Sequence, residues 1–85
     1  MLEQQIQKKI IDKLESKGYF VVKTVKTNKN GVPDLIACKD TQCIWIEVKR
    51  PGGKLSKLQE YRISEMKRKG LQVMVCYGVD EIENI

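Results

Sequence analysis

The spacing of apolar side chains predicts two helices. Over residues 2–17 apolar residues recur three or four positions apart, which places Leu2, Ile6, Ile10, Ile11 and Leu14 on one stripe, and Gly18 follows as a stop. A second helix begins after Ser56, because Gln59 three residues on completes a capping box. It runs to about Lys69 and ends at Gly70.

Four short segments are predicted strands: 19–25, 33–38, 43–49 and 71–77. The polar residues 39–42 join the second and third of these strands as a hairpin. Segment 71–77 is nearly all apolar, which predicts a strand covered on both faces. The order α-β-β-β-α-β indicates one α/β domain over residues 1–85, a mixed sheet with helices packed on it. The tail from Val79 is too short to assign.

Composition excludes several classes of site. The 85 residues contain 16 Lys and Arg, 11 Asp and Glu and no His, so Ser-His-Asp triads, Cys-His pairs and His-ligated zinc are excluded. The longest apolar run, 73–77, is too short to cross a bilayer, and the N-terminus does not resemble a secretory signal. We therefore expect a soluble, cytoplasmic protein without a membrane partner.

The cysteines are expected to be free thiols. Cys38, Cys43 and Cys76 are an odd number without a repeated CxxC spacing, and all lie in apolar stretches. Free cysteine there acts as a small hydrophobic residue, and the absence of an export signal favours a reducing compartment.

Positive charge is concentrated in two segments. Residues 17–29 and 49–57 contain basic residues and no acid, whereas the last six residues hold three acids. Such a distribution is typical of a phosphate-binding surface, with solvated lysines as the alternative.

Two carboxylates break the hydrophobic pattern of the hairpin. With a symmetric turn, paired residue numbers sum to 81, so Cys38 faces Cys43, Ile36 faces Trp45 and Asp34 faces Glu47; Lys49 projects from the same face as Glu47. Opposed like charges destabilise a sheet unless they are compensated, and Mg²⁺ is a natural compensator. The alternative is that Lys49 neutralises the pair at an exposed edge.

Glu3 and Trp45 have two readings each, and Gln59 has one. Glu3 lies on the apolar stripe of the first helix. One reading is that its carboxylate meets a partner from the sheet. The other is that the helix macrodipole favours an acid in the first turn, at a terminus that frays. Gln59 is explained by its capping box alone. Trp45 either stacks on a base or belongs to the core.

Together these residues resemble a known family. Pro33-Asp34 followed by Glu47-Val48-Lys49 is similar to the PD-(D/E)XK signature of restriction-endonuclease-like nucleases. The wider pattern resembles the VRR-NUC (virus-type replication-repair nuclease) family over Glu3 to about Tyr77, in the stand-alone form found in phages. The segments that carry this resemblance are Gly31–Ile36, Ile46–Lys49, Gly53–Ser56 with Gln59, and Glu3 with Ile6-Gln7.

The resemblance implies a minimal αβββαβ nuclease core and a role for each residue. Asp34, Glu47 and the Val48 carbonyl would ligate Mg²⁺ or Mn²⁺, with Glu3 reaching the metal through water. Lys49 would lie beside the scissile phosphate and Gln59 would brace the site. Neither a histidine base nor an organic cofactor is implied.

The resemblance also implies a substrate and an assembly. The substrate would be branched DNA, cut by a homodimer similar to junction resolvases, in the host cytoplasm if the chain is phage-encoded. A flap or nicking enzyme, an exonuclease working with partners, and a non-catalytic nucleic-acid-binding module remain alternatives. Residues expected to contact DNA phosphates are Lys23, Lys26, Lys29, Arg50, Lys54 and Lys57.

Overall fold

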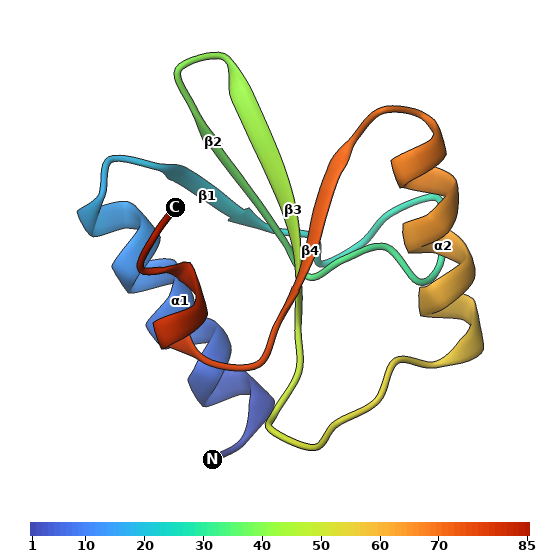
Figure 1. The fold of residues 1–85 in the computed structure, drawn as a ribbon, viewed down its shortest axis with the longest axis horizontal. Coiled ribbons are helices and arrows are strands. Elements are labelled where there is room, and N and C mark those ends of the chain that lie inside the picture. Colours follow the sequence, from blue (N-terminus) through green and yellow to red (C-terminus); the bar gives the residue numbers. More distant parts are fainter.

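The computed structural model describes residues 1–85 and has the predicted order of elements (Figure 1). The chain forms α1 (Glu3–Ser16), β1 (Phe20–Lys23), β2 (Leu35–Lys39), β3 (Gln42–Val48), α2 (Lys57–Arg68), β4 (Gln72–Cys76) and a short 3-10 helix, η1 (Val79–Ile82). The ends of the predicted helices and strands differ from the observed ones by one or two residues. None of the helices combines the length and apolar character needed to cross a membrane.

The four strands form one mixed sheet in the order β1-β2-β3-β4. The first two pairs are antiparallel, and β3 with β4 is parallel, which requires the crossover through α2. Cys38 pairs with Cys43 and Ile36 with Trp45, so the predicted hairpin register is confirmed. Asp40 and Thr41, both at positive φ (53° and 66°), form the two-residue turn that sets this register.

The main core lies between the sheet and α1. Ile10 and Leu14 are fully buried against alternate residues of β2 and β3, such as Leu35 and Ile46. The helix η1 lies on the same side as α1, whereas α2 lies on the other side (Figure 1). Ile82 of η1 completes the core, so the C-terminal segment has a structural role.

The prediction that the last strand is covered on both faces is confirmed in part, because β4 contacts α2 on one face and η1 on the other but is only half-buried. β4 is an edge strand, and of its residues only Cys76 is buried, while Val73, Met74 and Val75 are half-buried. Its pairing is limited to β3, and α2 covers one face of it incompletely. The apolar run reflects the chemistry of the side chains; it does not specify the position of the strand in the sheet.

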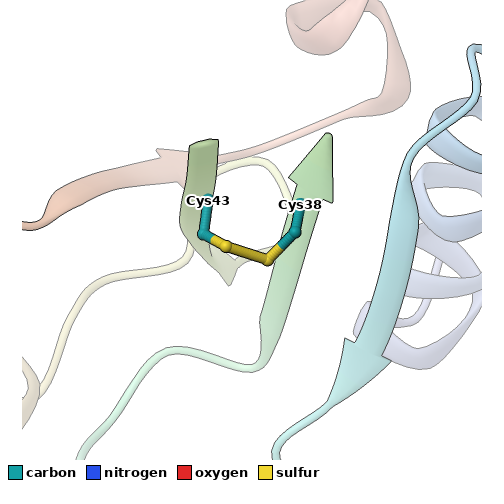
Figure 2. Close-up of a disulfide and its surroundings, with 2 residues drawn as sticks. All are labelled: Cys38 and Cys43. Carbon is teal, nitrogen blue, oxygen red and sulfur yellow. A yellow bond between two sulfur atoms is a disulfide. The ribbon is translucent and has the colours of Figure 1, made fainter. Parts of the chain in front are cut away.

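The prediction that all three cysteines are free was wrong. Cys38 and Cys43 form a disulfide that links β2 to β3 beside the turn (Figure 2). The hairpin register places the two residues directly opposite, with 4.1 Å between their Cα atoms, so their side chains are within bonding reach. Cys76 is free and buried, as expected.

Candidate active site

The candidate residues meet at one end of the sheet. Asp34 directly precedes β2, whereas Glu47 and Val48 end β3 and Lys49 follows them. Because β2 and β3 are antiparallel, the start of one strand lies beside the end of the other. The local hairpin thus brings two carboxylates, one backbone carbonyl and one ammonium group to the same place.

Asp34 is held by backbone groups on both sides. Its Oδ2 accepts a hydrogen bond from the amide of Val48 at 2.8 Å. Its backbone carbonyl accepts one from the amide of Thr24 at 2.9 Å, and the Thr24 hydroxyl donates to the carbonyl of Pro33. Thr24 therefore positions the Pro33-Asp34 segment, a role that no sequence pattern indicated.

Glu47 is the only charged residue in the buried interior, with 2% of its surface exposed. Its Oε2 accepts a hydrogen bond from Gln59 Nε2 at 3.3 Å and lies 4.0 Å from Lys49 Nζ. Its Oε1 is buried and has no hydrogen-bond partner. Burial first, then the negative charge of Asp34 and a hydrogen bond with the Asp34 carboxyl group, raise the pKa of Glu47 to about 8, although Lys49 acts in the opposite direction.

Gln59 reaches Glu47 because the start of α2 orients its amide. The Gln59 side-chain oxygen accepts from the amide of Ser56 at 2.9 Å, and the Ser56 hydroxyl accepts from the amide of Gln59 at 3.1 Å. The predicted capping box is thus confirmed. With its oxygen engaged in the cap, the Gln59 side chain presents its NH₂ group to Glu47, so one side chain caps the helix and contacts the site.

Glu3 lies near the same site from the other side of the sheet. It is the first residue of α1, and its Oε2 accepts from the backbone amide of Arg50 at 3.5 Å, a long hydrogen bond. Its negative charge is the weakest of the influences that raise the pKa of Glu47. The apolar stripe of α1 therefore brings this carboxylate to the segment that follows Lys49.

The donor set fits a hydrated divalent cation. No group of three or more His, Cys, Asp or Glu side chains could hold a metal ion by itself. Mg²⁺, however, is typically bound by one or two carboxylates together with waters and phosphate oxygens. Adjacent carboxylates of Asp34 and Glu47, with Glu47 Oε1 buried and without a proton donor, provide such a pair. A cation would neutralise the charge that otherwise raises the pKa of Glu47.

The six basic residues expected to contact DNA are all exposed. Lys26 and Lys29 lie in the loop between β1 and β2, which leads into Asp34, and Lys23 ends β1 just before it. Arg50 and Lys54 lie in the loop after Lys49, and Lys57 begins α2. Both loops extend from the end of the sheet that carries Asp34 and Glu47.

Trp45 is half-buried rather than part of the closed core. It lies on the face of β3 that carries Glu47 and lines a cavity beside α2. Trp45 is therefore outside the buried core and forms part of the cavity wall.

The comparisons with known proteins agree with this geometry. The family model of the VRR-NUC domain matches residues 2–80. A solved structure described as a VRR_NUC domain superimposes with a TM-score of 0.85 at 23% sequence identity, covering 95% of this chain and 89% of the other. Comparison with curated proteins gives no significant match. The fold and the family expected from the residues are therefore confirmed.

Proposed function

Because the chain belongs to the VRR-NUC domain family of nuclease-like domains, we propose that it is a metal-dependent endonuclease that cuts branched DNA. The observation that carries this proposal is the buried carboxylate of Glu47 beside Asp34, with no N–H or hydroxyl group donating to its Oε1. A structural carboxylate would be fully hydrogen-bonded or exposed to water. A buried, incompletely satisfied pair is what a metal-dependent site requires.

In this proposal Asp34, Glu47 and the carbonyl of Val48 hold Mg²⁺ or Mn²⁺, and Glu3 contacts it through water. Such a cation polarises the scissile phosphate and lowers the pKa of its bound water. The hydrogen bond from the Val48 amide fixes the orientation of the Asp34 carboxylate, so the residue that offers its carbonyl as a ligand also helps to place Asp34. The hydrogen bond from Gln59 Nε2 orients the Glu47 carboxylate in the same way, through its Oε2.

Lys49 is suited to the developing negative charge. Its side chain is only 13% exposed, and its ammonium lies 4.0 Å from Glu47 Oε2, so it is held in place near the carboxylates. In a partly dry site this charge stabilises the negative transition state of phosphodiester hydrolysis and helps to orient the attacking water. The chain contains no histidine, so no histidine base contributes.

The exposed lysines and Arg50 support DNA as the substrate, because they can contact its phosphates. They flank the site on two loops, so a backbone can bind across Asp34 and Glu47 with its phosphates in contact with both loops. Contacts of this kind position a substrate without reading its sequence and weaken as salt increases. We therefore expect recognition of DNA structure with little sequence preference.

A homodimer is part of the proposal. Phe20 and Val22 lie on the face of the sheet opposite α1, 72% and 41% exposed, and are paired with Cys38 and Ile36 on the same face. Helix α2 contacts β4 on this face and leaves the β1–β2 half without a helix. A second copy that covers this half would bury apolar surface and relate two sites by a twofold axis, as cutting of a symmetric junction requires.

The direct test is cleavage of labelled four-way junction, flap and linear duplex DNA by the wild type and by Asp34→Asn. We expect cutting of branched DNA with Mg²⁺ or Mn²⁺, none with EDTA, and at least about a 100-fold loss in the variant with DNA binding retained. Paired symmetric nicks in the junction would indicate a dimeric resolvase, and cutting of the flap alone would indicate a flap nuclease. Binding without cutting in either metal would indicate a non-catalytic module and contradict the proposal.

A further inference from the structure

A second recognition site adjoins the proposed catalytic one. A cavity of about 430 Å³ opens between the β1–β2 loop, β3 and the C-terminal half of α2. This volume lies within the range of roughly 300–1,000 Å³ typical of small-molecule sites. Trp45 contributes an aromatic surface to it, and Val32, Met66 and Leu71 contribute apolar walls. The cavity can therefore receive a flat, apolar group.

The loop wall of this cavity is fixed against α2. The Arg62 guanidinium donates from Nε to the carbonyl of Asn30 at 2.8 Å and from Nη1 to Glu65 at 2.6 Å. Gly31 has a positive φ of 80°, and a Cβ atom there would lie 2.9 Å from Leu58 Cγ, so only glycine allows this approach. The cavity is thus maintained by the fold before any ligand binds.

The rim of the cavity is positively charged. Lys29 comes from the loop and Lys69 from the end of α2, and neither forms an ion pair, whereas Arg62 is paired with Glu65. The pKa of Glu65 is lowered, first by its hydrogen bond from Arg62 and also by the charges of Lys29 and Lys69, so these cations gather around one carboxylate. Three cations and one anion leave an excess of positive charge at the rim.

An aromatic surface under a cationic rim matches a nucleotide, which has a flat base and a charged phosphate. Trp45 and Glu47 lie on the same face of β3 two residues apart, about 7 Å along the strand. A base in this cavity would therefore place its own backbone beside Asp34 and Glu47. A paired base inside a duplex cannot enter such a cavity, because it is stacked and hydrogen-bonded to its partner.

We propose that the cavity between Trp45, Lys29 and Lys69 binds one unpaired nucleotide of the DNA substrate and so selects branched or gapped DNA over perfect duplex. This inference rests on the proposed function only in taking DNA as the partner. It assigns the choice of DNA structure to a site outside the carboxylate cluster.

The test uses Trp45 directly, because it is the only tryptophan of the chain. We would titrate the wild-type protein in EDTA with fluorescein-labelled duplexes and follow binding by anisotropy, and repeat the titration with unlabelled duplexes to follow tryptophan fluorescence. The three duplexes are perfectly paired, carry one unpaired thymine, or carry an abasic site at that position. We expect saturable quenching by the unpaired thymine and little quenching by the other two. Removing the base should weaken binding at least about fivefold.

Matched variants test the rim. Lys69→Gln and Lys29→Gln should each weaken binding of the duplex with the unpaired thymine several-fold more than binding of perfect duplex. Lys67→Gln, which removes the same charge from an exposed position of α2 outside the cavity, should affect all three duplexes equally. Equal effects of Lys69→Gln and Lys67→Gln would overturn the assignment.

The remaining outcomes separate this proposal from the nuclease proposal. Binding of all three duplexes with unchanged tryptophan fluorescence, or with equal quenching, would overturn the cavity assignment while metal-dependent cutting of branched DNA could still be observed. If free thymidine monophosphate quenches the tryptophan fluorescence and DNA at the same concentration does not, the cavity binds a mononucleotide. That result would also overturn the proposal that it binds an unpaired nucleotide of DNA. No binding of any DNA would contradict both proposals.

Discussion

At the scale of single residues, the chemistry of this protein centres on Glu47. A carboxylate with 2% exposure would ordinarily be expensive to bury, and here it receives one amide hydrogen bond and one distant ammonium. Asp34 adds a second negative charge beside it, so the protein without a cation favours a protonated Glu47 at neutral pH. This arrangement lowers stability at the position where the proposed metal site would have two carboxylate ligands.

The raised pKa of Glu47 predicts an unusual dependence of stability on pH. Between 4.5, its ordinary value, and about 8, the folded protein holds a proton that the unfolded chain has lost. The free energy of unfolding without metal should therefore fall as pH rises through this window, by up to about 1.4 kcal/mol per unit, with no loss from this group below 4.5. Urea unfolding in EDTA at several pH values measures this slope.

Two variants isolate the contribution of Glu47 to that slope. Glu47→Gln should flatten it, because the neutral amide does not titrate. Glu60→Gln, at an exposed position of α2, should leave it as in the wild type. Identical slopes for the wild type and Glu47→Gln would show that the buried carboxylate does not control stability in this range.

At the scale of elements, the cap of α2 is part of the site. Ser56 and Gln59 satisfy each other's amides, and the orientation this imposes directs the Gln59 NH₂ group to Glu47. Helix α2 thus contributes to the site through its first turn, while its later turns line the cavity beside Trp45. The hairpin contributes in the same way, since its two-residue turn determines which residues stand opposite each other.

Mutations can distinguish the effect of the α2 cap on the site from its effect on helix stability. Ser56→Ala should lower the free energy of unfolding by about 1 kcal/mol and release the Gln59 side chain. Because residues that orient metal ligands typically contribute about 10–100-fold, we expect a comparable loss of cleavage rate at saturating metal. Ser64→Ala, at an exposed position within α2, should change neither property appreciably. A Ser56→Ala protein that is less stable but cuts at the wild-type rate would contradict this role.

At the scale of the whole molecule, the sheet is covered unequally. One face is closed by α1 and η1, whereas the other is covered by α2 only near β4 (Figure 1). A chain of 85 residues builds a thin core, and it exposes Phe20 and Val22 on the uncovered half. In the proposed dimer, this half of the sheet would be covered by the second copy.

Phe20→Ser tests the proposed dimer. The side chain is 72% exposed, so its replacement should leave the unfolding of a monomer almost unchanged while it weakens the dimer at least about tenfold. Sedimentation or light scattering over a range of concentrations measures the association, and the symmetry of junction nicks should decline with it. Val25→Ser, 87% exposed but beyond the end of β1, is the matched control. Monomeric wild-type protein at high concentration would contradict the proposal.

The order of the elements, the register of the hairpin and the grouping of Asp34, Glu47 and Lys49 could all be derived from the sequence. These features depend on contacts between residues close in the chain, where periodicity, turn length and capping residues are informative. The clear error concerned the disulfide. The register had placed Cys38 opposite Cys43, but the assumption of a reducing compartment led to free thiols.

Only the tertiary structure decided how distant segments meet. It placed Glu3 beside Arg50, directed Gln59 to Glu47, held Asp34 with Thr24, put β4 at the sheet edge and opened the cavity beside Trp45. Each of these depends on how helices and loops pack across the sheet, and that packing is set by the shapes of all the side chains together. Local sequence specifies which groups are available, and long-range packing determines which of them come into contact.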